Sequence, residues 1–516
     1  MKKFSMPQRD SLNEAKAHLL ANIGSNIVAV FVNALIAVWL TSYLVHRLGV
    51  EVYGVISLVV SFIAYFELCT RSITSTVSRY VAVSLNSKKI EISSTYFSTA
   101  FFALVILCGV LLVPVIILSV TFARLFNIPE GFEAESGWLV FLVMLSSFIN
   151  AISSPFLVST FVTHRFYLSN LVKILGLLLR AGVIVLCFAW LGAALQYVGL
   201  SYCAMALFGL IGAVVQTRFL TPELHVKPGL FRWNAFREMT VMNTWVTINQ
   251  VGSLLYLSVS FMVINIFLGS EQCGRYGTIV LWVTLLDLLG GAVGDVFSPI
   301  AFDYIARGRI DIMAFQMRRS TKFLCLIMGL PVGLLCGLSV PILKCWLGPS
   351  FADLGPLAWL LVGPWIVNVA VRPMFSIFRG LDRVKIPAIA TVIGGVVNVV
   401  LSILLIRYTN MGIYGVALAL SLSLVVKNPF FTTIYAAIIT NQPKMIFIRE
   451  IMPGVAMTVA TSLLVFGLSR ICNLASIPKL LLVSSVVILV YGLVYLGVFM
   501  KKEDRLFFMS LIMRER

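Results

Sequence analysis

Long apolar runs, separated by short polar segments, make up most of the chain. The run from Phe97 to Val120 contains no charged residue, and a run of about 18 or more apolar residues can cross a bilayer as a helix. A membrane β-barrel would instead show short strands in which apolar and polar residues alternate. The unbroken runs therefore predict membrane-spanning helices and exclude the barrel.

Fourteen such runs follow one another, as six, six and a final two. The spans are predicted at Asn22–Leu44, Tyr53–Ala82, Tyr96–Val120, Trp138–Phe161, Leu168–Trp190, Leu195–Gln216, Val241–Leu268, Tyr276–Ala306, Phe323–Leu343, Leu357–Phe378, Ile386–Ile406, Tyr414–Ile438, Ile451–Leu468 and Leu480–Met500. The fold class is an all-α integral membrane protein. Its parts are a first lobe (1–221), a second lobe (222–440) and a final helix pair with a charged tail (441–516).

The composition agrees with this layout. Of 516 residues, 60% are hydrophobic and 12% are charged, and the mean hydropathy is +1.00. No water-soluble domain has such a composition. Because one span needs about 20 apolar residues, this content fills about 14 or 15 spans.

The net charge of +18 arises from 39 Lys and Arg against 21 Asp and Glu. In a soluble protein this excess would suggest a nucleic-acid partner, so the positions of the charges decide its meaning. With the N-terminus in the cytoplasm, 26 basic residues fall in inner segments and 7 in outer loops. Cytoplasmic loops collect Lys and Arg in this way. We therefore expect both termini in the cytoplasm and no nucleic-acid partner.

The two groups of six helices repeat one another. At an offset of 218, Asn150 falls on Asn368, Pro155 on Pro373, Arg165 on Arg383 and Gly176 on Gly394. The turn Leu48–Gly49 with Tyr53–Gly54 recurs as Leu268–Gly269 with Tyr276–Gly277, with three extra residues in the second copy. Since six is even, both copies cross the membrane in the same direction. This predicts two lobes in parallel repeat around a central cleft.

These features together resemble the polysaccharide transporter family. The resemblance rests on the six-six-two layout, the turn at Leu48 to Gly54 and the Pro155/Pro373 repeat. The family includes the Wzx-type flippases for lipid-linked oligosaccharides, and its superfamily includes lipid II flippases and multidrug and toxin extrusion antiporters. The resemblance implies an alternating-access, V-shaped transporter with its cargo held between the lobes.

Charged residues inside the spans are the main candidates for a site, because a charge at mid-helix costs about 2.5 to 3.5 kcal/mol on insertion scales. The basic candidates for binding a diphosphate or sugar are Arg71, Lys173, Arg180, Arg372 and Lys427. Lys173 and Arg180 are seven residues apart, so they share one helix face. Lys173 and Arg372 lie near helix ends, where a long side chain can instead reach water. Lys427 precedes Asn428–Pro429, where the proline removes a helix hydrogen bond.

The acidic candidates are Glu67, Asp287 and Asp295, and they are predicted to bind a coupling ion, H⁺ or Na⁺. Two alternatives stay open. Glu67 and Arg71 are spaced i, i+4 and can form an internal ion pair. Asp287 and Asp295 can each pair with a cation across the cleft.

Polar amides and small residues complete the set of candidates. Asn26 and Asn249 are the candidates for sugar binding among amides on the first and seventh spans, although amides serve helix packing equally well. The whole amide group is Asn22, Asn26, Asn33, Asn243, Asn249 and Gln250. Glycines at Gly329, Gly333 and Gly337 predict close helix packing.

The leading hypothesis is a flippase that carries an undecaprenyl-diphosphate-linked oligosaccharide, such as an O-antigen repeat unit, to the outer leaflet of a bacterial inner membrane. Paired Arg and Lys suit a diphosphate, and polysaccharide polymerase machinery is a possible partner. The alternative is a cation-coupled multidrug antiporter of the same superfamily. A membrane-embedded glycosyltransferase or polymerase is less favoured, because the outer loops are short and no HExxH or P-loop motif occurs. We expect no cofactor and no metal, since the nine cysteines occur singly, mostly in apolar runs.

Overall fold

The computed structural model describes residues 9–87, 89–241, 244–471, 474 and 476–499. Nearly all of these are helical, and no strand occurs among them. Within them, thirteen helical stretches are long and apolar enough to span a membrane. One stretch, Trp245–Ala306, contains two predicted spans, and its backbone leaves the helix at Gly269, where φ is 87°. Each of the fourteen predicted spans overlaps one of these stretches, so the all-α membrane fold is confirmed.

Contacts divide the chain into two compact units. Unit 1 holds residues 1–254 and 269–274, and unit 2 holds residues 255–268 and 275–516. The long helix α10 (Thr244–Gly294) therefore contributes to both units. The predicted three-part division at residues 221 and 440 follows topology rather than contacts, and it stays a prediction.

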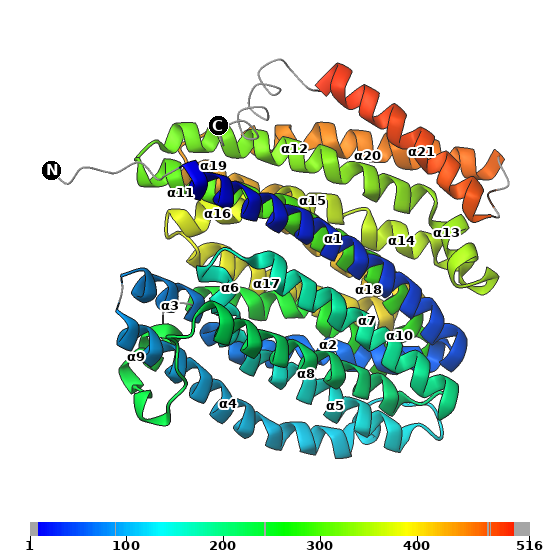
Figure 1. Ribbon diagram of the computed structural model, residues 1–516. Helices are drawn as coiled ribbons and strands as arrows, with labels where there is room; N and C mark the ends of the chain where they lie inside the picture. Colours follow the sequence, from blue (N-terminus) through cyan, green and yellow to red (C-terminus); the bar gives the residue numbers. More distant parts are fainter. Residues whose placement is uncertain (1–8, 88, 242–243, 472–473, 475, 500–516) are drawn as a thin grey trace. The chain divides into compact units, whose positions relative to one another are not determined.

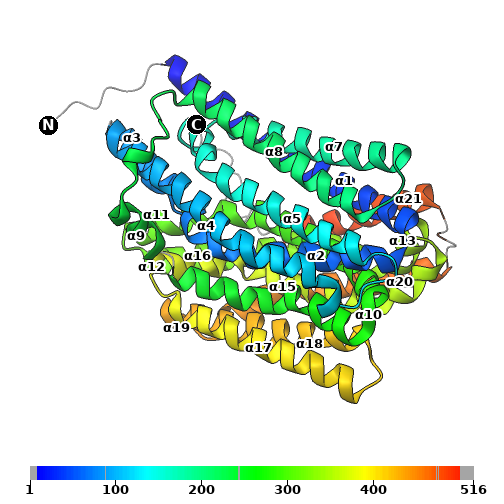
Figure 2. The same ribbon diagram turned by 90° about the horizontal axis from the view of Figure 1, so that it is seen from below.

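Unit 1 is a bundle of long helices in which α5 lies along α8, α8 along α7, and α1 along α7 (Figures 1 and 2). Further contacts join α4 to α5 and α2 to α5. The elements are α1 (Arg9–Leu48), α2 (Val50–Thr74), α3 (Val77–Asn86), α4 (Ile90–Leu125), α5 (Glu133–Ser153), η1 (Ser154–Leu157), α6 (Val158–Val162), α7 (Phe166–Trp190), α8 (Leu195–Leu220), η2 (Pro228–Leu230) and α9 (Trp233–Val241).

Unit 2 has its main helix contacts between α12 and α20, between α17 and α18, and between α12 and α15. Besides its share of α10, it contains η3 (Asp295–Phe297), α11 (Ser298–Ala306), α12 (Ile310–Gly337), α13 (Ser339–Trp346), η4 (Pro349–Leu354), α14 (Gly355–Val362), α15 (Trp365–Ala370), α16 (Arg372–Gly380), α17 (Lys385–Tyr408), α18 (Ile413–Val426), η5 (Lys427–Thr432), α19 (Thr433–Ile439), α20 (Ile446–Ile471), α21 (Ile477–Val494) and η6 (Tyr495–Phe499).

The internal repeat is visible in matching hydrogen bonds. The Cys203 Sγ donates to the Leu142 carbonyl at 3.0 Å in unit 1, and Ser421 Oγ donates to the Leu360 carbonyl in unit 2. Both residues of the second bond lie 218 positions after those of the first. The α5–α8 crossing of unit 1 therefore recurs as the α14–α18 crossing of unit 2.

A tight turn is repeated in the same way. His164 has φ 56° and Asp382 has φ 54°, and the two residues are 218 apart. In each turn the next residue closes a wide loop: Arg165 N donates to Thr160 O at 3.0 Å, and Arg383 N donates to Phe378 O at 2.8 Å. We call the end of each unit that carries this turn its inner end, because its basic loops are predicted to face the cytoplasm.

Two glycines, 220 residues apart, allow one very close helix crossing in unit 1. A Cβ added at Gly54 would lie 1.9 Å from the Ser270 carbonyl oxygen, and one added at Gly274 would lie 2.0 Å from that of Val50. Val50 and Ser270 are also 220 apart, so the crossing has approximate two-fold symmetry. Any side chain at either glycine would separate the helices.

This crossing corrects the predicted alignment of the repeat. Gly49 and Gly269 both have positive φ, 85° and 87°, and both open a helix. From there Gly54 corresponds to Gly274 with no gap, so the predicted insertion of three residues before Gly277 is wrong. Spacing between tyrosines suggested the insertion, whereas backbone contact fixes the match.

Proline interrupts the fourth and tenth predicted spans at equivalent places. In unit 1, α5 ends at Ser153 and the turn η1 carries Pro155. In unit 2, α15 ends at Ala370, and α16 starts at Arg372 with Pro373 behind it. A proline lacks the N–H that would continue the helix, so the helix breaks in both lobes.

The final helix pair packs on α12 through small residues. A Cβ at Gly329 would lie 2.6 Å from Thr458 Oγ1, and one at Gly333 would lie 3.0 Å from Thr461 Cβ. From the other side, a Cβ at Gly454 would lie 2.4 Å from Cys325 Sγ. The predicted role of the glycine series in close packing is confirmed, and α20 is its partner.

Candidate functional site

Arg180 lies near the middle of α7 in unit 1, where the neighbouring helix α8 offers it an aromatic ring. Its Cζ is 3.7 Å from the centre of the Tyr202 ring, a distance at which a guanidinium is attracted to a ring face. Its Nε atom is buried and has no hydrogen-bond partner. No carboxylate among the described residues pairs with it, so its charge is uncompensated.

Tyr53 belongs to the same neighbourhood. It is buried on α2, its hydroxyl is 3.3 Å from Thr41 Oγ1, and it interacts electrostatically with both Arg180 and Tyr202. Three helices, α2, α7 and α8, thus place polar or aromatic groups around one cation. The sequence identified the cation but not the two tyrosines.

The position that corresponds to Arg180 in unit 2 is Asn398 of α17, and its role differs. Asn398 is buried, and its Nδ2 donates to the backbone carbonyls of Leu255 at 2.9 Å and Tyr256 at 3.3 Å. It therefore ties α17 to α10. The lobes are chemically different at this level: unit 1 holds a charge where unit 2 holds a structural amide.

Lys173 lies two turns from Arg180, on the same helix, and is exposed. An unbroken α7 keeps the two side chains on one face, about 10 Å apart along the axis. Lys173 is about two turns from the start of α7, so its side chain can reach the inner end. Arg180 lies deeper and is half-buried. Of the two residues, it is the one that contacts an aromatic ring and has a buried Nε atom.

Arg71 does not pair with Glu67, although their spacing allows it. Arg71 Nη1 instead donates to Gln250 Oε1 at 2.7 Å, which connects α2 to the start of α10 within unit 1. The Glu67 carboxylate is exposed and forms no ion pair with a described residue. The sequence spacing could not show this because Gln250 is 179 residues from Arg71.

Arg372 and Asp287, predicted for different roles, form one ion pair in unit 2. The Arg372 Nη2 is 2.7 Å from Asp287 Oδ1 and also donates to the Asp287 carbonyl at 3.2 Å. The arginine lies against two glycines of α10: a Cβ would be 3.1 Å from its Nη1 at Gly291 and 3.3 Å from its Cδ at Gly294. One predicted phosphate ligand is therefore neutralised by one predicted ion-coupling carboxylate.

Lys427 lies inside the helices of unit 2 and pairs with no carboxylate among the described residues. Its Nζ lies 5.6 Å from the centre of the Tyr256 ring and 5.9 Å from that of Phe375. The residue opens η5, a π-helical turn that contains Pro429, so regular α-helical hydrogen bonding is interrupted where the proline was predicted to remove a bond. Such wide turns inside helices are found frequently at functional sites.

Two residues near Lys427, Tyr256 and Asn428, have unsatisfied polar atoms. The Tyr256 hydroxyl is buried and has no hydrogen-bond partner, and neither has Asn428 Oδ1. Asn428 uses its Nδ2 to donate to Asn368 Oδ1 at 2.8 Å. A buried polar atom without a partner costs free energy, so this neighbourhood is prepared to accept further hydrogen bonds.

The remaining predicted residues are placed as follows. Asp295 begins η3, is exposed and pairs with no described residue, and Asn26 on α1 is exposed. Asn249 lies half-buried on α10, and its carbonyl accepts from Ser253 Oγ at 3.1 Å. Asn243 is outside the described residues.

One amide of the predicted group has a clear structural role instead. Asn22 Nδ2 donates to the His164 carbonyl at 2.7 Å, and Asn22 Oδ1 accepts from Tyr167 N at 3.0 Å. Asn22 therefore caps the start of α7 from α1. The backbone amide that it caps is 145 residues away, so no local sequence signal marked it.

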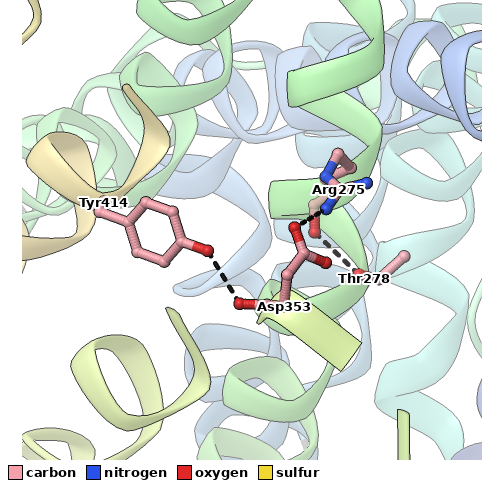
Figure 3. Close-up of polar contacts among 4 residues, drawn as sticks. All are labelled: Arg275, Thr278, Asp353 and Tyr414. Atoms are coloured by element: carbon pink, nitrogen blue, oxygen red, sulfur yellow. Dashed lines mark hydrogen bonds and ion pairs between the residues drawn. The ribbon is translucent and has the colours of Figure 1, made fainter. Parts of the chain in front are cut away.

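At the opposite, outer end, unit 2 has a polar cluster that the sequence did not reveal. Arg275 of α10 forms an ion pair with Asp353 of η4, and Tyr414 of α18 donates to the Asp353 carbonyl at 2.9 Å (Figure 3). Asp353 corresponds, at offset 218, to Glu135, which accepts from Leu195 N at 2.8 Å and so caps α8. The internal repeat was the sequence signal that could have revealed this cluster. It aligns two acids that each connect helices at the outer end of a unit.

The chain matches the family model for polysaccharide biosynthesis proteins over residues 19–305, more than half its length. The chain belongs to this family. Among relatives, this polysaccharide biosynthesis protein is 28% identical to the uncharacterized membrane protein EpsK of Bacillus subtilis (strain 168), over 94% of this chain and 96% of EpsK. It is 21% identical to a candidate O-antigen transporter of Shigella flexneri, over 72% of this chain and 87% of that protein.

Solved structures share the fold of this polysaccharide biosynthesis protein at low identity. The lipid II flippase MurJ, in an inward closed conformation, matches with a TM-score of 0.65 and 15% identity over 94% of this chain and all of MurJ. An inward-facing multidrug resistance MATE family transporter of the MOP superfamily matches with a TM-score of 0.60 and 14% identity, over 85% of this chain and 99% of that one. The predicted family is confirmed, the solved structures show that the fold is shared, and the protein is a multi-pass membrane protein.

Proposed function

We propose that this protein is a flippase that moves a polyprenyl-diphosphate-linked oligosaccharide from the cytoplasmic leaflet to the opposite leaflet by alternating access. One observation carries the proposal: each unit holds an uncompensated cation inside its helices, Arg180 in unit 1 and Lys427 in unit 2, and each cation faces aromatic rings. Cations that stay unpaired inside a membrane are costly. An anion bound beside these cations would offset that cost.

The chemistry of these two residues suits a diphosphate and a sugar. A guanidinium and an ammonium are strong hydrogen-bond donors to phosphate oxygens, and contacts with charged groups are worth about 1.5 to 3 kcal/mol. Tyr202, Tyr256 and Phe375 offer flat apolar faces beside them, and the Tyr256 hydroxyl and Asn428 Oδ1 have bonding capacity left over. The polyprenyl tail of such a cargo needs no protein path, because it stays in lipid.

The relatives support the class of cargo. One is named as an O-antigen transporter and a fold neighbour is a lipid II flippase. By the same proposal the protein lies in a bacterial inner membrane, with both termini in the cytoplasm and polysaccharide polymerase machinery as its partner. It acts as a transporter rather than an enzyme and uses no cofactor. A gradient of H⁺ or Na⁺ supplies the energy for transport.

The test is a flipping assay in proteoliposomes. A fluorescent polyprenyl-diphosphate oligosaccharide is placed in both leaflets, and a membrane-impermeant reductant bleaches the fraction that becomes accessible. We expect wild-type protein to make nearly all of the label accessible, and the Arg180→Ala and Lys427→Ala proteins to slow this exchange strongly. Arg407→Ala, which removes an exposed arginine at the end of α17, serves as the control.

Two results would count against the proposal. A rate no higher than in protein-free vesicles would reject this cargo class. Proton- or sodium-driven uptake of an organic cation by the same vesicles, with no movement of the lipid-linked sugar, would favour the multidrug antiporter instead.

A further inference from the structure

The segment between α8 and α10 presents basic and aromatic side chains at the inner end of unit 1. It carries four basic residues, Arg218, Lys227, Arg232 and Arg237, and two acids, Glu223 and Glu238. All four basic residues are exposed, and none forms an ion pair with a described residue. We call this segment, residues 218–241, the linker segment.

The backbone of the linker segment is fixed to the start of α4. Ser98 Oγ donates to the His225 carbonyl at 2.9 Å and accepts from Lys227 N at 3.2 Å. Thr99 Oγ1 accepts from Arg232 N at 3.1 Å. The segment is therefore an ordered surface held against a helix rather than a free loop.

Helix α9 turns one face inward and the other outward. Ala235 and Met239 are buried, and the Met239 carbonyl accepts from Thr76 Oγ1 at 3.3 Å. The α9 contacts are with α2 and α4 (Figures 1 and 2). On the outer face, Trp233 is 66% exposed, one turn from Arg237. The apolar face of α9 is therefore used for packing on α2 and α4, and its outer face presents Trp233 and Arg237 away from the bundle.

The level of the segment along the bundle agrees with an interfacial position. Ser98 and Thr99 follow Tyr96, where the third span is predicted to enter the apolar part of the membrane. Phe219, at the end of α8, is 83% exposed. Trp and Tyr side chains prefer the headgroup region of a bilayer, so an interfacial position of this segment would bring Trp233 and the basic residues to the depth of the lipid phosphates.

The charge of the outer face selects the kind of lipid. Glu238 accepts from the Tyr96 hydroxyl at 2.7 Å, which keeps this acid on the side of α4. The Arg232 guanidinium donates to the Phe231 carbonyl at 3.5 Å, and the Arg232 and Arg237 side chains form no ion pair with a described residue. We propose that the linker segment binds the headgroups of anionic phospholipids, with Arg232 and Arg237 on the phosphate and Trp233 beside the acyl chains.

The experiment uses Trp233 as the reporter. The full-length protein is reconstituted in vesicles that contain equal amounts of phosphatidylglycerol and phosphatidylcholine, with bromine on the acyl chains of only one of the two lipids. Bromine quenches tryptophan on contact. Because the chain has nine tryptophans, the signal of a Trp233→Phe protein is subtracted to isolate Trp233.

We expect brominated phosphatidylglycerol to quench Trp233 about twofold or more better than brominated phosphatidylcholine, because each basic residue near the surface attracts anionic lipid. In an Arg232→Gln/Arg237→Gln protein, quenching should continue with no preference between the lipids. The matched control, Arg379→Gln/Arg383→Gln, removes the same charge from the inner end of unit 2 and should keep the preference.

Wild-type protein alone can overturn the proposal. Equal quenching by the two lipids would show an interfacial helix with no anionic site. A Trp233 that neither lipid quenches would place the surface in water or against another protein. Salt offers a further check, since 1 M salt should reduce a preference that rests on charge. None of these measurements involves the cargo, so they are independent of the flippase assay.

Discussion

Arg180 is the residue on which the proposed cargo site depends most. Replacing it with Ala should weaken cargo binding about 10-fold to 150-fold, because a charged hydrogen-bond donor is worth about 1.5 to 3 kcal/mol. Lys should restore only part of the affinity, since an ammonium lacks the planar fork that stacks on Tyr202 and binds two oxygens at once. The measurement is cargo affinity of detergent-purified protein.

Stability separates this role from a structural one. No described carboxylate loses a partner when Arg180 is removed, so the Arg180→Ala protein should express and unfold like wild type. A well-folded Arg180→Ala protein with normal affinity and flipping would show that the cation is not part of the site.

Arg372 and Asp287 should behave in the opposite way, as a coupled pair. Asp287→Asn leaves Arg372 without its partner, so it should lower the stability of the wild-type protein. The same Asp287→Asn change should cost less stability when it is made in the Arg372→Gln protein, where no partner is lost. Because the Asp287 side chain is 43% exposed and the Arg372 side chain 25%, the coupling energy should be about 1 kcal/mol or less. Thermal unfolding of all four proteins completes this cycle, and additive effects would mean that the pair contributes no stability.

At the scale of elements, the attachment of α20 to α12 depends on glycine. Gly454→Ala places a Cβ 2.4 Å from Cys325 Sγ and 2.9 Å from the Cys325 carbonyl carbon, so the helices must separate. We expect a loss of about 1 to 3 kcal/mol, as for overpacking. The control is Gly467→Ala on the same helix, where no heavy atom lies within 4 Å. That change should be neutral or slightly stabilising, because Ala favours helix. Equal thermal stability of the two variants would contradict this account of the packing.

The sequence predicted elements well and their side-chain partners poorly, for one physical reason. Helix positions follow from local apolar content, although the predicted fourth and tenth spans ran through Pro155 and Pro373, where the helices break. Partners depend on distant segments: Arg71 bonds to Gln250, 179 residues away, and Arg372 to Asp287, 85 residues away. The i, i+4 spacing of Glu67 and Arg71 allowed an ion pair that does not form, and the arginine donates instead to the Gln250 amide oxygen of α10.

For the whole molecule, the pairing of Asp287 reduces the candidates for energy coupling to Glu67 and Asp295. Both are exposed, and neither pairs with a described residue. If either carries the coupling ion, Glu67→Gln or Asp295→Asn should abolish the acceleration of flipping by an imposed H⁺ or Na⁺ gradient and leave cargo affinity unchanged. The assay compares initial rates with and without the gradient. A wild-type rate that ignores both gradients would reject coupling altogether.

The two inner turns have the same backbone conformation, so one stabilising substitution can be tested twice in the same protein. His164 and Asp382 occupy the same left-handed backbone conformation in two copies of one turn, and such a conformation costs a non-glycine residue about 1 kcal/mol or more. Glycine removes that strain, at some cost in unfolded-chain entropy. His164→Gly and Asp382→Gly should therefore shift the melting temperature in the same direction, and the double variant by the sum. Two additive, thermostabilising changes far from either cation would give a sturdier starting protein for purification.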